Sequence, residues 1–167
     1  MLALRRRQVK NFFCLLMLSN GTPMFCAGDE FLNTQGGNNN PYNQDNETTW
    51  LNWSKLEQNR DLFQFFQRMI AFRKTHPAIG CGRYWREAVT WYGAAGPVDF
   101  NSHCLAYSLD NLYVMINAFW EPVRFQIQQP GAWNCVVDTS RQDSATQTVD
   151  GLNYEVAPRS VVVLEHA

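Results

Sequence analysis

Side chains that can hydrogen-bond and stack against a sugar gather in one polar stretch, residues 28–58. Amide, carboxyl and hydroxyl groups match the hydrogen-bonding capacity of sugar hydroxyls, and aromatic rings match the apolar faces of sugar rings. Asparagine and aspartate also fold loops through contacts with the backbone, so the composition leaves both interpretations open. We expect Tyr42 and Trp50 to be the stacking rings. The candidate substrate-binding residues are Asp29, Glu30, Gln35, Asn39, Asn40, Tyr42, Gln44, Asp45, Asn46 and Trp50.

The cysteines and histidines do not have the spacing of a metal or redox site. Five cysteines occur without a CxxC pair, and most of them lie in or beside apolar runs. This pattern is typical of buried free thiols rather than of disulfides or zinc ligands. The three histidines are single residues without ligand spacing. We therefore expect no metal ion and no other cofactor.

The charge balance argues against nucleic acid and membranes as partners. The net charge is −1, and the basic cluster at residues 5–7 is local, which is typical of a solvated helix face. Residues 5–18 imitate a secretory signal, with basic residues followed by an apolar run. A bulky residue stands at the cleavage position, however, and the run is well short of the about 20 residues that span a membrane. We expect a cytoplasmic protein.

The polar stretch must be positioned by the elements on either side of it. Apolar residues at three- and four-residue spacing predict a helix over residues 2–19. The short apolar run at residues 22–27 predicts a strand that is buried on both faces, as in parallel sheets. One such strand cannot form a sheet by itself. The pattern therefore predicts an incomplete (β/α) unit.

A second helix and then a series of short strands follow the polar stretch. The helix is predicted over residues 59–76, with Asn59 as its N-cap and Pro77 as its end. Short β-type runs separated by turn residues then predict an antiparallel β-sandwich. We therefore expect an α+β chain in two parts, residues 1–80 and residues 81–167. The predicted strands cover residues 88–92, 104–109, 113–118, 123–128, 134–138 and 160–164.

The most specific feature of the sequence is a set of long contiguous motifs. They are residues 21–24 (GTPM), 27–30 (AGDE), 34–46 (TQGGNNNPYNQDN), 112–122 (LYVMINAFWEP) and 159–164 (RSVVVL). These motifs resemble those of isoamylase-type glycogen-debranching enzymes, which belong to the α-amylase family of glycoside hydrolases. The resemblance covers essentially the whole chain. Phe100 is a departure, because the family commonly has tryptophan there, and this puts a local packing or stacking role in doubt.

The resemblance implies that residues 1–80 are the C-terminal fragment of a (β/α)8 barrel, namely its last helix, strand, loop and helix. Residues 81–167 would be the C-terminal β-sandwich domain. Active sites of such barrels lie at the C-terminal ends of the strands, so residues 28–58 would form one wall of the substrate cleft. The resemblance also places the catalytic carboxylates of the family upstream of residue 1.

Asp29 and Glu30 cannot replace those carboxylates. Retaining glycosidases need two carboxyl groups about 5–5.5 Å apart across the scissile bond. Adjacent residues on an extended backbone point to opposite faces, so these two cannot face one sugar together. They could instead hydrogen-bond sugar hydroxyls or orient neighbouring carboxylates, or they could satisfy backbone amides and arginine side chains around the barrel mouth. We therefore expect no catalytic residue in this chain.

The expected function is that of the C-terminal portion of an enzyme that cleaves α-1,6 branch points of glycogen or limit dextrin. The chain alone is expected to be inactive and to bind the α-glucan. Its unpaired strand and apolar helix faces predict that residues 1–76 self-associate or bind the missing barrel half, unless the helices collapse on each other. The alternative function is a stand-alone, non-catalytic α-glucan-binding or scaffold module, which should cover residues 22–27 within its own chain.

Overall fold

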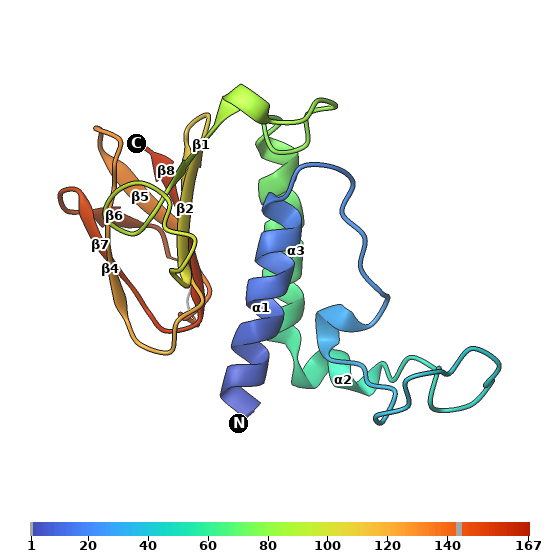
Figure 1. Ribbon diagram of the computed structural model, residues 1–167. Helices are drawn as coiled ribbons and strands as arrows, with labels where there is room; N and C mark the ends of the chain where they lie inside the picture. The colour runs from blue at the N-terminus through green and yellow to red at the C-terminus, as the bar shows by residue number, and fades with distance from the viewer. Residues whose placement is uncertain (1, 143–144) are drawn as a thin grey trace.

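Two helices run side by side in the same direction and form one layer of the computed structural model, which describes residues 2–142 and 145–167 (Figure 1). They are α1, Leu2–Leu18, and α3, Arg60–Thr75. Both predicted helices are therefore confirmed. The rings of Phe13 and Phe66 stack between them with centroids 3.5 Å apart. No helix in the described part of the chain is long and apolar enough to cross a membrane.

The C-terminal end of α1 is held by an arginine of α3. The Nη1 atom of Arg73 donates to the carbonyl oxygens of Met17 at 2.6 Å and Ser19 at 2.7 Å, and its Nη2 atom donates to the carbonyl of Gly21. The last carbonyls of a helix lack an intrahelical N–H partner, so the guanidinium supplies what the helix cannot. Gly21 has a φ of +97°, the left-handed conformation that ends a helix.

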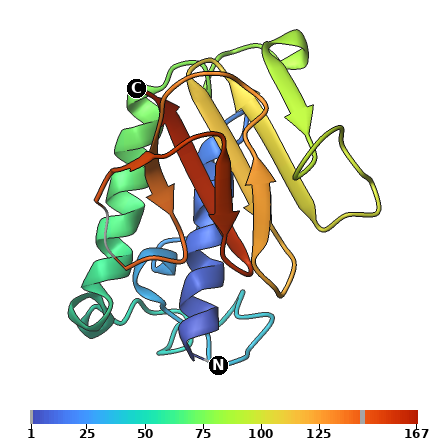
Figure 2. The ribbon, with the colours of Figure 1, turned by 90° about the vertical axis from the view of Figure 1, so that its left-hand side faces the viewer.

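Two antiparallel sheets form the other layers of the molecule (Figure 2). The larger sheet has the strand order β1-β2-β3-β8-β5-β6, and the smaller sheet pairs β4 with β7. The strands are β1 Val89–Tyr92, β2 Cys104–Leu109, β3 Leu112–Asn117, β4 Val123–Gln126, β5 Trp133–Asp138, β6 Gln147–Val149, β7 Asn153–Val156 and β8 Ser160–His166. The remaining helical segments are η1 Asp29–Phe31, α2 Ser54–Gln58 and η2 Arg86–Ala88.

The predicted strands are confirmed with small shifts at their ends, whereas β6 and β7 were not predicted. These two strands have three and four residues, which is too short for an apolar alternation to show. Asp110, with a φ of +53°, turns the chain between β2 and β3, as the hairpin pattern indicated. The sheets together give the expected antiparallel β-part of an α+β chain.

Both faces of the larger sheet are covered. Along β8, Val161 and Val163 belong to the core shared with the helices, whereas Val162 and Leu164 belong to the core shared with β4 and β7. Successive side chains of a strand point to opposite faces of the sheet, so β8 contributes side chains to both cores. The helical layer thus shares a hydrophobic core with the sheet. That residues 1–80 and 81–167 are separate domains stays a prediction.

Polar contacts also join the helices to the larger sheet. The buried Asn11 of α1 accepts a hydrogen bond from Oγ1 of Thr139 and donates to the carbonyl of Arg159 at 2.8 Å. After the end of α3, Nε2 of His76 lies 3.2 Å from Oε1 of Glu165 in β8. Polar contacts therefore join the helical layer to the sheet at the middle of α1 and at the C-terminal end of α3.

Two of the three arginines at residues 5–7 are docked rather than simply solvated, which corrects the prediction for them, whereas Arg5 is exposed. Arg6 donates to Oδ1 of Asp61 at 2.5 Å and also to Asn59, and Arg7 donates to the carbonyl of Pro158 at 2.9 Å. The partners are 53 to 151 residues away along the chain, so a local charge pattern could not reveal them. Asn59 makes no side-chain cap of α3, contrary to the prediction; its Nδ2 donates to Phe31 and Lys55 carbonyls instead.

The predicted strand at residues 22–27 is wrong. Residues 22–26 have no regular secondary structure and no partner in either sheet. A strand is stabilised by hydrogen bonds to a neighbouring strand, and no described segment supplies one here. The side chain of Met24 is 86% exposed, while the ring of Phe25 packs edge-on against Phe13 at 5.1 Å. The apolar run therefore lies beside the helices as an unpaired segment.

Helix packing covers most of the apolar side chains that were predicted to be exposed. Phe13, Phe65, Phe66 and Met69 are buried between the helices and the sheet, whereas Phe12 is exposed. Most of these side chains are therefore buried by packing of the helices on each other, which is the competing outcome. Self-association through residues 1–76 stays a prediction.

Candidate functional site

The polar loop is anchored at its base by a short 3₁₀ turn. Phe31 of η1 is fully buried, its ring lies 5.3 Å from the ring of Trp53, and its carbonyl accepts a hydrogen bond from Nδ2 of Asn59 at 3.1 Å. Oδ1 of Asn33 accepts from the backbone N–H of Asn52 at 3.1 Å, which ties the two ends of the loop together. Gly28 has a φ of +99°, and a Cβ atom there would lie 2.6 Å from Cβ of Asn33. Only glycine fits this turn.

Asp29 and Glu30 accept hydrogen bonds within this turn. They lie in η1 and not on an extended backbone, which corrects the geometry expected for them. Oδ2 of Asp29 accepts from the backbone N–H of Cys26 at 3.1 Å, and Oε2 of Glu30 accepts from that of Gly28 at 2.8 Å. Both carboxylates therefore satisfy backbone amides, and their binding of sugar hydroxyls stays a prediction.

A polar cavity of about 430 Å³ opens within the loop. Two of the predicted residues, Gln35 and Trp50, line it. The ring of Trp50 is 60% exposed, and its Nε1 donates to Oδ1 of Asp45 at 2.8 Å, so the ring is held in place while its surface stays accessible. The other lining residues are Asn33, Thr34, Gly36, Glu47, Thr48, Leu51, Asn52 and Lys55.

The remaining predicted residues lie outside this cavity. Gln44 accepts from Nδ2 of Asn38 at 3.0 Å and donates to the carbonyl of Asn40 at 3.3 Å. Oδ1 of Asn46 accepts from the backbone N–H of Thr48 at 2.9 Å. These contacts fold the loop itself, as the second interpretation of its composition allowed. Tyr42 and Asn39 are exposed away from the cavity lining.

Sequence reasoning missed several lining residues, among them Glu47, Thr48, Asn52 and Lys55. Lys55 reaches the cavity because α2 begins at Ser54, directly after the loop, and this short helix was not predicted. Just before this helix, Oδ1 of Asn52 accepts from the backbone N–H of Ser54 at 3.1 Å, which forms an Asx turn.

The cavity can bind a ligand that carries many hydroxyl groups. It combines amide, hydroxyl and charged groups of both signs with one accessible indole ring, which suits a sugar hydrogen-bonded at its edges and stacked on one face. Within residues 2–142 and 145–167, no group of three or more histidine, cysteine or acidic side chains is arranged to hold a metal ion.

Comparison with known proteins gives relatives in both sequence and structure, although no protein-family model matches the chain. The chain is 36% identical over 180 residues to Isoamylase 3, chloroplastic, of Oryza sativa subsp. japonica, over 98% of this chain and 23% of that protein. It is 45% identical over 84 residues to the Glycogen operon protein GlgX homolog of Mycobacterium bovis, over 50% of this chain and 12% of that protein.

A solved structure shares the fold over nearly the whole chain. It is the pullulanase from Paenibacillus barengoltzii in complex with maltohexaose and α-cyclodextrin, with a TM-score of 0.76 and 26% identity, over 97% of this chain and 25% of that one. The chain spans about a fifth of the length of the curated isoamylases that it matches. Helical layer and sheets both take part in the structural match. The chain belongs to the isoamylase-type debranching enzymes, and it corresponds to a segment from their C-terminal part.

Proposed function

We propose that this chain is the C-terminal portion of an enzyme that hydrolyses α-1,6 branch points of glycogen or limit dextrin. In this proposal the loop at residues 28–58 forms one wall of the substrate cleft and binds the α-glucan. The observation that carries the proposal is the polar cavity of about 430 Å³ beside the fixed, accessible ring of Trp50. The isoamylase relative and the pullulanase solved with maltohexaose support an α-glucan as the ligand.

Residues 1–80 would be the last helix, strand position, loop and helix of a (β/α)8 barrel. A second cavity, of about 440 Å³, supports this assignment. It lies between α1 and residues 24–33 and is lined by the exposed side chains of Phe12 and Met24 together with Phe25. The unpaired segment at residues 22–26 runs along it, so a neighbouring barrel strand would pair with that segment and cover these side chains.

The chain by itself would bind but not hydrolyse. Asp29 and Glu30 accept hydrogen bonds from backbone amides of their own turn, and the catalytic carboxylates would come from the barrel portion. The purified chain should therefore release no reducing ends from glycogen or pullulan. Release that is abolished by Asp29→Asn or Glu30→Gln would overturn this part of the proposal.

Glucan binding can be tested by electrophoresis of the chain through gels that contain glycogen. Trp50→Ala should weaken the retardation about three- to tenfold, as expected for the loss of roughly 1 kcal/mol of aromatic contact. Trp120 is the matched control, because its ring is also 60% exposed but lies outside the loop. Equal losses for Trp50→Ala and Trp120→Ala would show that the loop is not the glucan site.

The alternative, a stand-alone α-glucan-binding or scaffold module, differs in what covers the second cavity. A stand-alone module should cover residues 22–27 within its own chain and stay monomeric, whereas a C-terminal portion leaves this surface for a barrel portion made separately to bind. Phe12→Asp would then abolish binding of the barrel portion without unfolding the chain, because Phe12 is exposed. A barrel portion that does not bind, together with retained glycogen binding, would favour the stand-alone module.

A further inference from the structure

Two side chains of opposite charge line the loop cavity, and neither is engaged by another described residue. Glu47 comes from the loop itself, and the half-buried Lys55 comes from α2. Among the described residues, neither side chain takes part in a hydrogen bond or an ion pair. Their charged atoms are therefore too far apart for a direct ion pair, although they line the same space. A ligand group that both donates and accepts can fit between them.

The hydroxyl groups of a sugar have this double capacity. A carboxylate only accepts hydrogen bonds and an ammonium group only donates them, whereas a hydroxyl does both. Neighbouring hydroxyls of one sugar unit can therefore donate to Glu47 and accept from Lys55. Hydrogen bonds with a charged partner are roughly twice as strong as those between neutral groups. The ring of Trp50, held by Asp45, supplies the flat apolar surface beside them.

Other polar groups of the cavity are already used to fold the loop. Oδ1 of Asn33 accepts from the backbone N–H of Asn52 at 3.1 Å. Oδ1 of Asn52 in turn accepts from the hydroxyl of Ser54 at 2.6 Å. These amides therefore line the cavity with part of their hydrogen-bonding capacity spent. The charged groups of Glu47 and Lys55 are left entirely to a ligand.

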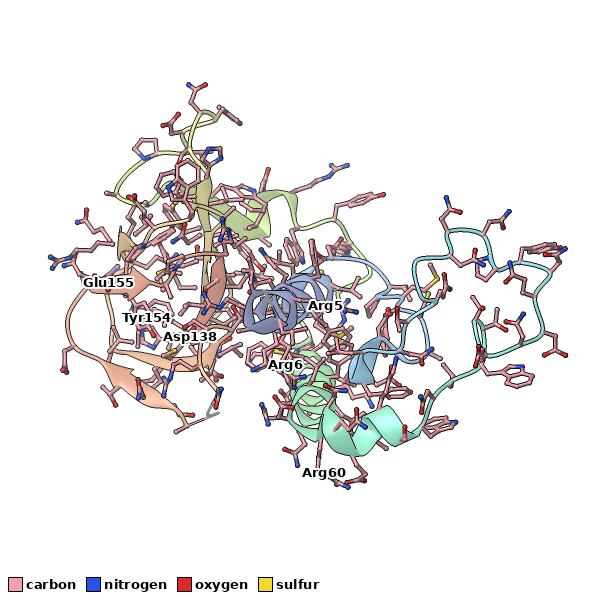
Figure 3. All side chains as sticks on the ribbon, turned by 90° about the horizontal axis from the view of Figure 1, so that it is seen from below. Arg5, Arg6, Arg60, Asp138, Tyr154 and Glu155 are labelled. Atoms are coloured by element: carbon pink, nitrogen blue, oxygen red, sulfur yellow. The ribbon has the colours of Figure 1, made fainter. Side chains whose placement is uncertain are left out.

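The loop carries an excess of negative charge. Residues 28–58 contain five carboxylates, and Lys55 is their one basic residue. Figure 3 shows this loop projecting from the helical layer on the side away from the sheets, whereas the labelled Arg5 and Arg60 lie on the helices. Of the five carboxylates, Glu57 alone forms an ion pair among the described residues, with Arg60. Surface charges act over about 8 Å at physiological ionic strength, so an anionic group in the cavity is disfavoured.

We propose that Glu47 and Lys55 make the loop cavity selective for an uncharged glucan segment over one that carries phosphate monoesters. This inference rests on the proposed function, because it takes the loop as the glucan site. Hydroxyls of one sugar unit donate to Glu47 and accept from Lys55, while the face of the sugar lies on Trp50. A phosphate monoester brings about 1.5–2 negative charges. The single ammonium group of Lys55 cannot balance these charges beside the carboxylate of Glu47.

Nuclear magnetic resonance titration of the chain with maltotriose tests this selectivity at the site itself. The indole N–H resonance of Trp50, assigned by its absence in Trp50→Phe, reports binding at the loop. We expect a Kd on the order of 1 mM for maltotriose. Maltotriose with a phosphate monoester on every sugar unit should bind at least tenfold more weakly, because every register places a phosphate in the cavity. Equal Kd values for the two sugars would overturn the proposal.

Matched variants test the two residues. Glu47→Gln and Lys55→Met should each raise the Kd for maltotriose about three- to tenfold, as expected for weakening or losing one hydrogen bond with a charged partner. Glu57→Gln and Lys74→Met are the controls and should leave this Kd unchanged, because both residues are exposed and neither lines the loop cavity. Unchanged Kd values in both Glu47→Gln and Lys55→Met would also overturn the proposal.

The ratio of the two Kd values separates charge from shape. Glu47→Gln should reduce the preference for plain over phosphorylated maltotriose at least threefold, because the amide carries no charge to repel the phosphate. Raising the salt to about 0.5 M should reduce the preference of the parent chain as well, and should leave the Kd for plain maltotriose unchanged. A preference that responds to neither change contradicts the role of Glu47.

Failure of this inference differs from failure of the proposed function. A Trp50 resonance that shifts with maltotriose, together with unchanged affinities in Glu47→Gln and Lys55→Met, overturns the selectivity and leaves the loop as the glucan site. A Trp50 resonance that does not respond to maltotriose overturns the loop as the glucan site, and the selectivity with it.

Discussion

Asn11→Ala should lower the stability of the whole chain, because Asn11 joins the helical layer to the sheet. Its side chain is buried, its Oδ1 accepts from Oγ1 of Thr139, and its Nδ2 donates to the carbonyl of Arg159 at 2.8 Å and to Oε1 of Gln8 at 2.9 Å. The hydroxyl of Thr139 in turn accepts from the backbone N–H of Val161 at 2.8 Å. The substitution therefore breaks a continuous chain of hydrogen bonds from α1 to β8.

The size of the effect follows from the groups that lose a partner. A buried donor or acceptor left unpaired costs about 1–3 kcal/mol, and two such groups on the sheet side are affected. Alanine is the better helix former by less than about 1 kcal/mol, which offsets part of the loss. We expect the free energy of unfolding to fall by about 3 kcal/mol. For a chain of this size, such a loss lowers the Tm by about 6–12 °C.

Urea unfolding of the variant, followed by tryptophan fluorescence and by far-ultraviolet circular dichroism, measures this loss. Both signals should shift together, because the helices and the sheet share one core. Asn101→Ala, in an exposed loop, is the control and should change the stability by less than about 0.5 kcal/mol. A loss below about 1 kcal/mol for Asn11→Ala would refute the view that these hydrogen bonds hold the helical layer to the sheet. Two separate transitions would instead support the predicted division into independent parts, residues 1–80 and 81–167.

Thiol chemistry, backbone geometry and acid titration give three further tests. A thiol reagent should label the exposed Cys26 and Cys81 in the native chain, and should reach the buried cysteines, whose pKa values burial raises, only in denaturant. Labelling of every thiol in the native chain would contradict this. Gly131→Ala should cost about 1–3 kcal/mol in chemical denaturation, because Gly131 has a φ of +142°, a backbone conformation that residues with a Cβ atom rarely adopt; an unchanged midpoint would count against it. Burial acts to raise the pKa of Asp61, but the hydrogen bond from Arg6 and the charge of Arg6 lower this pKa on balance. The stability that Asp61 contributes is therefore fully present above its unfolded pKa of about 4. It is lost as the pH falls through the lower pKa of the folded chain. In Asp61→Asn, the free energy of unfolding should therefore fall less steeply as the pH is lowered. The difference should be below about 1 kcal/mol, because the Arg6–Asp61 pair is partly exposed to solvent. Identical profiles of unfolding free energy against pH for the variant and the parent would exclude this contribution.

Much of the fold could be predicted because its signals are local. The periodicity of apolar residues gave both long helices, and Gly21 marked the end of the first one. The strands of the central sheet were recognisable from β-branched runs between turn residues. In the candidate site, the same local reading identified Trp50 and Gln35, whose side chains do line the cavity.

Other features depended on partners that are distant in the sequence. The apolar run at residues 22–27 has the composition of a buried strand, but strand formation needs a neighbour, and none is present among the described residues. Arg6 is docked because Asp61 lies beside it, 55 residues away. Asp29 and Glu30 hold the turn at the base of the loop, although their residue types alone suited a sugar equally well.

The sequence by itself determined the two long helices, the longer strands of the sheets and the family that the motifs resemble. Only the tertiary structure decided which polar residues fold the loop and which line its cavity, and it alone placed the buried Lys10 of α1 over the Phe65 ring of α3. The physical reason is the range of the interactions. Helix periodicity and turn preference act over a few residues, whereas cavities, buried cations and sheet pairing depend on segments brought together by packing of the whole chain.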